Sequence, residues 1–176
     1  MELKRINYGD LPYTALLYCK TGVGKSTAIG LIAERSEGNT LVLDIDRTIT
    51  RTLAKGEIVK DTSKVLVNEI DNVHTFEAWT KTLQEITPQW LEQNNIKTVA
   101  VDNVSELERC ILSDLGQQGK NKGVPAMADY QYMQFKLVNS LRYMKSWGVN
   151  IVWTAWETAE QLWSACHQSH PSWSRL

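Results

Sequence analysis

A short glycine-rich run near the amino terminus carries residue types that bind phosphate groups. Residues 19–26 read CKTGVGKS and match the pattern G-x-x-x-x-G-K-[ST] at its last three positions, with Cys19 in place of the first glycine. Glycines at 22 and 24 let backbone N–H groups turn towards phosphate oxygens, and a following helix directs its positive end at the same anion. We therefore predict a phosphate-binding loop at this position.

The polar side chains of this loop predict a nucleotide held together with a divalent cation. Lys25 is placed to reach the β and γ phosphates of ATP, and the Ser26 hydroxyl to ligate Mg²⁺. The residues that we expect to contact the nucleotide are Thr21, Gly22, Val23, Gly24, Lys25, Ser26 and Thr27. A glycine-rich turn that contains GKS by chance is the alternative, but an apolar run before it and an amphipathic run after it favour the phosphate loop.

Carboxylates follow two later apolar runs. Asp102 follows TVAV, and we predict it to be the second Mg²⁺ ligand, because ligands bind at the carboxyl ends of parallel strands. Its alternative role is to cap the helix that follows. Asp44 and Asp46 lie in LVLDIDR, where a carboxylate can orient an attacking water. Glu106, four residues beyond Asp102, is the competing general base, and the residues alone leave this choice open.

Alternating apolar and amphipathic runs predict the elements that must position these residues. Short runs rich in branched residues predict core strands over 14–18, 40–45, 97–101 and 149–155, with a minor strand over 65–67. Apolar residues at helical spacing predict helices over 26–35, 75–93, 104–115 and 130–144, the second of them kinked or divided by Pro88. This alternation predicts an α/β fold with a mostly parallel sheet and helices on both faces.

Composition limits the classes of partner. The chain has 176 residues and a formal net charge of −1, so no overall basic field recruits nucleic acid, and such a contact requires a local patch. No run approaches the length of a membrane span and the first residues lack the apolar core of a signal peptide. We expect a cytoplasmic protein with no membrane partner. Its three cysteines show no metal or redox spacing and are expected to be free thiols.

A local basic patch lies in the second half of the chain. Residues 116–127 (GQQGKNKGVPAM) are rich in glycine and carry Lys120 and Lys122, so we predict a mobile loop. From 116 to 147 there are five basic residues and one acidic residue, Asp129. Three aromatic residues beside the loop are candidates for base stacking: Tyr130, Tyr132 and Phe135. The alternative is an ordinary helix with core aromatics and a solvated lysine face.

Taken together, YCKTGVGKST, LVLDIDR, TVAVDNVSELE and NIVWTAWE resemble the RecA-like core of P-loop NTPases over about residues 13–157. In particular, they resemble short phage-encoded AAA-type nucleotide-binding proteins related to single-strand-annealing recombinases. The resemblance implies ATP and Mg²⁺ as cofactors, and an acidic residue at the end of the second strand that activates water. It therefore favours Asp46 over Glu106 as the base. The host cytoplasm is the location implied for a phage-encoded chain.

The same resemblance assigns further regions. The family's loop after the Walker B helix contacts single-stranded DNA, which implies Lys120 and Lys122 as DNA-binding residues. Thr154 and Glu157 match the region that senses the γ-phosphate. RecA-like cores often complete their sites between subunits, so a homo-oligomer is expected. We assign residues 1–157 to one ATPase domain and leave 158–176 unassigned.

The sequence is compatible with three functions. The first is an ATPase of phage recombination or replication that binds single-stranded DNA, the second is a small P-loop kinase, and the third is a nucleotide-binding assembly protein with little turnover. A kinase ordinarily has an arginine-rich lid, whereas residues 116–127 contain lysines and no arginine.

In the tail, Cys166, His167 and His170 lack a fourth ligand, so no metal site is predicted there.

Overall fold

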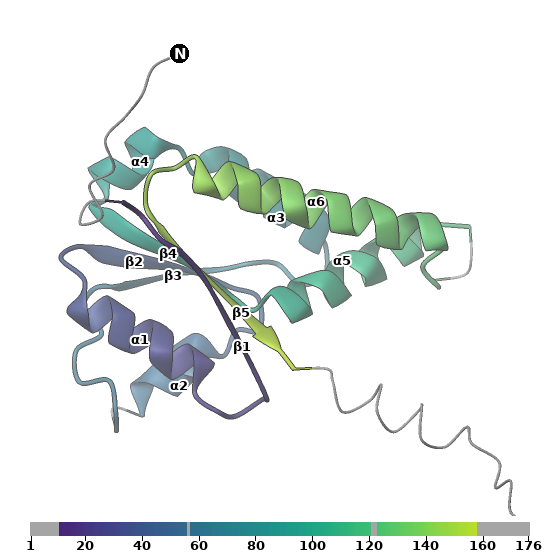
Figure 1. Cartoon of the computed structure of the whole chain (residues 1–176). Coiled ribbons are helices and arrows are strands. Elements are labelled where there is room, and N and C mark those ends of the chain that lie inside the picture. The colour runs from purple at the N-terminus through teal and green to yellow at the C-terminus, as the bar shows by residue number, and fades with distance from the viewer. Residues whose placement is uncertain (1–10, 56, 121–122, 158–176) are drawn as a thin grey trace, which may run out of the picture.

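Five parallel strands form the sheet of the computed structural model, which describes residues 11–55, 57–120 and 123–157 (Figure 1). The strands are β1 (Thr14–Cys19), β2 (Asn39–Asp44), β3 (Val65–Glu69), β4 (Ile96–Asp102) and β5 (Asn150–Trp156). Their order in space is β1-β5-β4-β2-β3, and every neighbouring pair is parallel. β5 therefore lies between the strand that precedes the glycine-rich loop and the strand that ends in Asp102.

Helices cover both faces of this sheet (Figure 1). The first layer contains α1 (Lys25–Arg35) and α2 (Ile49–Ala54), and the second contains α3 (Thr75–Glu85), α4 (Pro88–Gln93), α5 (Val104–Gln118) and α6 (Met127–Lys145). Strand residues alternate between two cores: Val42 packs with the first layer, whereas Leu41 and Leu43 pack with the second. The predicted α/β fold, a parallel sheet with helices on both faces, is confirmed.

Proline and capping residues explain two boundaries. Pro88 divides the helix predicted over 75–93, because proline has no N–H and clashes with the preceding turn. The hydroxyl of Thr87 accepts a bond of 3.2 Å from the backbone N–H of Trp90 and so caps the new helix α4. The short helix α2 was not predicted from its residues. It begins where the buried carboxylate of Asp44 accepts a bond of 3.1 Å from the backbone N–H of Ile49.

The segment predicted as a loop over 116–127 departs from that prediction at both ends, and at its second end Met127 is the first residue of α6. Residues 116–118 belong to α5, and Gly116 is buried. A Cβ atom at Gly116 would lie 2.8 Å from the backbone oxygen of Gly123, so the chain after the helix packs closely against it. Composition alone had suggested too little burial to form structure. The glycine instead allows the chain after α5 to approach the helix, which continues to Gln118.

Two predictions from the sequence fall outside the described residues. They concern Lys122 and the tail 158–176, including Cys166, His167 and His170. Among the residues that are described, no helix combines the length and the apolar character needed to cross a bilayer.

Candidate functional site

The glycine-rich loop joins the end of β1 to the start of α1. Gly22 and Gly24 have φ angles of 83° and 102°, in the left-handed region that a residue without a Cβ adopts at low cost. Gly24 is the residue immediately before α1, so the free backbone N–H groups of the first helical turn begin at this loop. The loop thus has the backbone geometry of an anion site at a helix N-terminus.

Lys25 is folded back against this loop. Its side chain is buried, and its Nζ atom donates to the backbone oxygens of Cys19 at 2.9 Å and Lys20 at 3.0 Å. Cys19 makes this contact through its backbone, so the replacement of the expected first glycine leaves it intact. Phosphate oxygens can take the place of these two carbonyl oxygens, because an ammonium group donates equally to either acceptor.

Asp102 is held by hydroxyl groups from two other elements. Ser26 Oγ donates to its Oδ2 atom at 2.6 Å, and Thr154 Oγ1 donates to its Oδ1 atom at 2.6 Å. Asp102 is 2% exposed and Thr154 is fully buried. The carboxylate does not cap α5: the next residue, Asn103, does so by accepting a bond of 2.8 Å from the backbone N–H of Glu106. Asp102 is therefore free of the structural role that was its alternative.

Asp46 lies beside this cluster and is held by Asn103. The side-chain Nδ2 of Asn103 donates to Asp46 Oδ2. Burial, together with the neighbouring carboxylates of Glu106, Asp102 and Asp44, raises the pKa of Asp46 to about 6, while Lys25 opposes this rise. A carboxyl group that titrates near neutrality suits a general base, because it is ionised at neutral pH and still accepts a proton readily.

The other two carboxylates have different surroundings. Asp44 is fully buried, accepts from the first turn of α2, and has its pKa raised by that burial. Glu106 Oε1 accepts a bond of 3.6 Å from Cys110 Sγ, one helical turn along α5, and burial together with Glu106 raises the pKa of that thiol to about 11. Arg47, the residue after Asp46, pairs with Glu69 at 3.9 Å. Its charge is therefore directed to Glu69 and does not neutralise the Asp46 carboxylate.

The structure brings most of the predicted site residues to one edge of the sheet. The phosphate loop, Asp102, Asp46 and Glu106 meet at the carboxyl ends of the strands, as open parallel sheets require. Lys120 follows the C-terminal end of the 15-residue helix α5, which is roughly 22 Å long. The glycine-rich loop and Lys120, the described residue of the predicted DNA-binding pair, are therefore distant from each other.

Asn103 and Thr154 contribute to the site through contacts that were not predicted from the sequence. No role was predicted for Asn103, yet its side chain donates to Asp46 and caps α5. Thr154 matches the region that senses the γ-phosphate, which stays a prediction, and its hydroxyl donates to Asp102. For Asn103, the available signal was an asparagine immediately after an aspartate at the end of a strand. The contact of Thr154 with Asp102 depends on which strands pair, so the sequence did not predict it.

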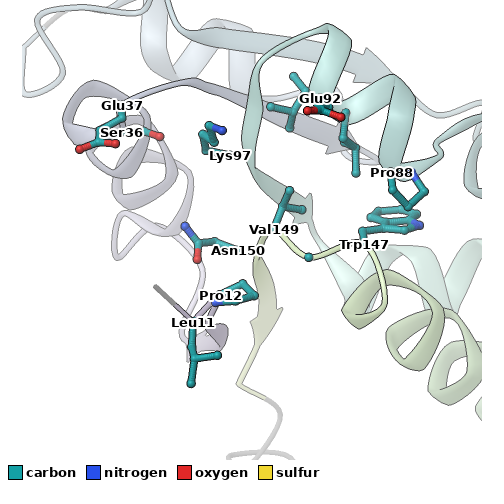
Figure 2. Close-up of a pocket in the computed structure, with 13 residues that line it drawn as sticks. Leu11, Pro12, Ser36, Glu37, Pro88, Glu92, Lys97, Trp147, Val149 and Asn150 are labelled. Carbon is teal, nitrogen blue, oxygen red and sulfur yellow. The ribbon is translucent and has the colours of Figure 1, made fainter. Parts of the chain in front are cut away.

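A cavity of about 620 Å³ lies at the opposite end of the sheet (Figure 2). Lys97 and Asn150, near the starts of β4 and β5, line it together with Trp147. It shares no residue with the phosphate loop, and Ser36 and Glu37, which also line it, follow the C-terminus of α1. That end of a helix carries partial negative charge and disfavours phosphate. The cavity is therefore separate from the candidate site.

Comparison with known proteins agrees with this geometry. Residues 11–167 match the family described as AAA domain. No curated protein matches the chain. The fold resembles three solved structures: the ATP synthase subunit NeqB from Nanoarcheaum equitans (TM-score 0.62, 10% identity), an ATPase of the type III secretion system of pathogenic bacteria (TM-score 0.51, 16% identity) and a KaiC-like protein from Pyrococcus horikoshii (TM-score 0.51, 15% identity).

These likenesses cover 90%, 88% and 85% of this chain, in the same order. The chain spans only 42%, 50% and 65% of the respective structures. At such low identity the likeness establishes the fold, which is that of P-loop ATPases.

Proposed function

The chain belongs to the AAA domain family, and on that basis we propose that it binds ATP with Mg²⁺ and hydrolyses it. The observation that carries the proposal is the 2.6 Å contact between the Ser26 hydroxyl and the Asp102 carboxylate. It places a hydroxyl from the phosphate loop next to a carboxylate from the end of β4. Mg²⁺ is typically held by one or two protein oxygens, substrate phosphates and water, so this pair fits the ion.

The loop residues supply the remaining contacts to the nucleotide. In the proposal, backbone N–H groups from Gly22 to Thr27 donate to the phosphates, and Lys25 exchanges its two carbonyl partners for phosphate oxygens. Ser26 and Asp102 would hold Mg²⁺, which would supply neutralisation of charge on the transferred phosphoryl group. Thr154 keeps the Asp102 carboxylate in a single orientation through its 2.6 Å bond.

Asp46 is the proposed general base. It accepts the proton of a water molecule that attacks the γ-phosphorus, while the bond from that phosphorus to the β–γ bridging oxygen breaks, which gives ADP and phosphate. Asn103 keeps the carboxylate in position, and the raised pKa of Asp46 suits proton transfer near neutral pH. Glu106 is the alternative base, because it lies close enough to influence Asp46.

We also propose that the chain binds single-stranded DNA, in phage recombination or replication. The support is the resemblance described above and the basic composition of residues 116–147. Helix α5 starts at the residue after Asn103 and ends two residues before Lys120, so one rigid element joins the two regions. A change at Asn103 on hydrolysis is therefore able to reach the DNA-contacting end.

An assay of ATP hydrolysis in Mg²⁺, with and without single-stranded DNA, tests the proposed function. We expect turnover that needs Mg²⁺ and that rises when the oligonucleotide is added. Binding of ATP without turnover in either condition would favour an assembly protein that uses nucleotide as a ligand. Transfer of phosphate to a small molecule instead of water would favour a kinase.

The double variant Lys120→Ala, Lys122→Ala is expected to bind single-stranded DNA more weakly, with a shallower dependence on salt. Binding releases fewer counterions when a phosphate contact is lost. The magnitude of the slope of log affinity against log salt should therefore fall by about 0.7 for each lost contact. The measurement is a salt titration with a labelled oligonucleotide. The control is Lys81→Ala, Lys97→Ala, which removes the same charge elsewhere, and equal slopes for both double variants would exclude the loop from the DNA site.

A further inference from the structure

A groove of about 310 Å³ lies between α3 and α6, within the second helical layer. Trp79 lines the groove, and its indole N–H donates to Ser140 Oγ at 3.0 Å. This N–H group therefore already has a hydrogen-bond partner within the protein. Polar and aromatic side chains from both helices line the groove: Phe76, Thr80 and Gln84 from α3, and Lys136, Asn139 and Tyr143 from α6. All nine residues that line the groove belong to these two helices.

An aromatic pair with a cation above it lies at one side of this groove: Phe76 lines the groove, and Tyr132 packs against Phe76 beside it. The rings of Phe76 and Tyr132 have centroids 5.7 Å apart and are tilted by 51°. The Lys136 Nζ atom lies 5.5 Å from the first centroid and 5.2 Å from the second. Tyr132 is 44% exposed, so part of its ring remains open to a ligand. Among the described residues, no carboxylate forms an ion pair with Lys136.

The lining of the groove contains one charged side chain, that of Lys136, which favours an anionic ligand. On α3, the acidic residues Glu77 and Glu85 lie outside this lining, and Glu85 pairs with Lys81 at 3.9 Å. The basic residues Lys136, Arg142 and Lys145 all lie on α6, whose one acidic residue is Asp129. The Asp129 carboxylate accepts a bond of 2.7 Å from the backbone N–H of Ala126 and so is occupied at the start of the helix. Aromatic rings beside a positive charge are features with which proteins hold single-stranded nucleic acid.

We propose that the α3–α6 groove holds unstacked bases of a single-stranded nucleic acid. Tyr132 and Phe76 form the stacking surface, Lys136 contacts the backbone phosphate, and the amides of Gln84 and Asn139 face base edges. This proposal rests on the single-strand binding proposed above and assigns the bases to a site formed by two helices that are distant in sequence. It extends the binding surface beyond the loop that carries Lys120.

A buried contact joins this groove to helix α5. The carboxylate of Asp114, which is 6% exposed, accepts a bond of 3.4 Å from the backbone N–H of Phe76 and one of 3.0 Å from Gln118 Nε2. Asp114 lies on α5, the helix whose first residue follows Asn103. The backbone of α3 at Phe76 is therefore joined by a hydrogen bond to the same helix that starts at the proposed hydrolytic site.

The test compares two labelled oligonucleotides of equal length, an oligothymidylate and an abasic strand, by fluorescence anisotropy. Tyr132→Leu keeps an apolar side chain but removes the ring, and it should weaken oligothymidylate binding by roughly fivefold or more while leaving abasic binding unchanged. Lys136→Met should weaken both and lower the salt slope by about 0.7. Controls are Tyr13→Leu, a tyrosine of similar exposure, and Lys81→Met, an exposed lysine on α3.

The outcomes separate this inference from the proposed function. If Tyr132→Leu and Lys136→Met bind like the parent while the Lys120 and Lys122 double variant is weakened, the groove is excluded and DNA binding stands. If the parent chain binds neither oligonucleotide, both the groove and the DNA-binding proposal fail, whereas ATP hydrolysis is judged separately. A change in sedimentation with unchanged oligonucleotide binding would make the groove a protein contact. Thermal unfolding of each variant establishes that it is folded.

Discussion

The Lys25→Ala variant is expected to lose ATP hydrolysis by about 100-fold or more, since removing one donor to a transferred charge typically costs 10²–10³ in rate. Its binding of ATP should weaken by about tenfold or more, because a hydrogen bond to a charged group contributes about 1.5–3 kcal/mol. The physical reason is the position of Lys25, whose ammonium group is buried within the loop and donates to two carbonyl oxygens there. Isothermal titration and a phosphate-release assay measure the two effects.

The matched control for this change is Lys97→Ala. Lys97 is exposed and lines the cavity at the opposite end of the sheet, so its loss changes net charge without touching the loop. Its ATP affinity and hydrolysis should equal those of the parent. Unchanged affinity and turnover in Lys25→Ala would remove the glycine-rich loop from the nucleotide site.

The Asp46→Asn variant is expected to keep ATP binding and to lose hydrolysis by roughly 10²–10⁴-fold, the usual contribution of a general base. An asparagine oxygen still accepts the bond from Asn103, so the local geometry is preserved while the base is removed. Glu106→Gln is the matched comparison, because it neutralises the second carboxylate near the site. We expect this variant to retain turnover, and loss of hydrolysis in Glu106→Gln with normal rates in Asp46→Asn would identify Glu106 as the base.

The pH dependence of the parent provides a second readout of the same residue. Asp46 must be ionised to accept a proton, and burial beside other carboxylates raises its pKa from 3.8 to about 6. Hydrolysis should therefore be full above this value and decline as the pH falls through about 6. A rate that stays constant between pH 7 and pH 5 would contradict the assignment of Asp46, whereas ATP binding measured over the same range controls for loss of the substrate.

The sequence by itself determined the order of elements and the chemistry of the loop. Apolar runs over 14–18 and 97–101 predicted β1 and β4. Branched apolar residues that alternate with other residues or follow one another without a break are typical of buried strands. Pro88 signalled the division of a helix through its missing N–H. The spacing of Gly24, Lys25 and Ser26 is local, so it could be read without knowing what packs around it.

Local composition was less reliable where burial depended on distant residues. The glycine-rich stretch 116–127 suggested a loop, yet Gly116 lies within α5 because Gly123 and Pro125 approach it closely. The same glycine content that suggests flexibility in a sequence also permits this close approach. Only the folded chain distinguishes the two cases.

The tertiary structure alone decided how the candidate site is assembled. Asn103 and Asp46 are 57 residues apart, and Thr154 and Asp102 are 52 residues apart, yet each pair shares a hydrogen bond. These contacts exist because the pairing order places β4 between β2 and β5, so the carboxyl ends of three strands meet. Hydrogen bonds act only over about 3 Å. The residue types predicted which groups could react, but the strand order determined which of them lie close enough to do so.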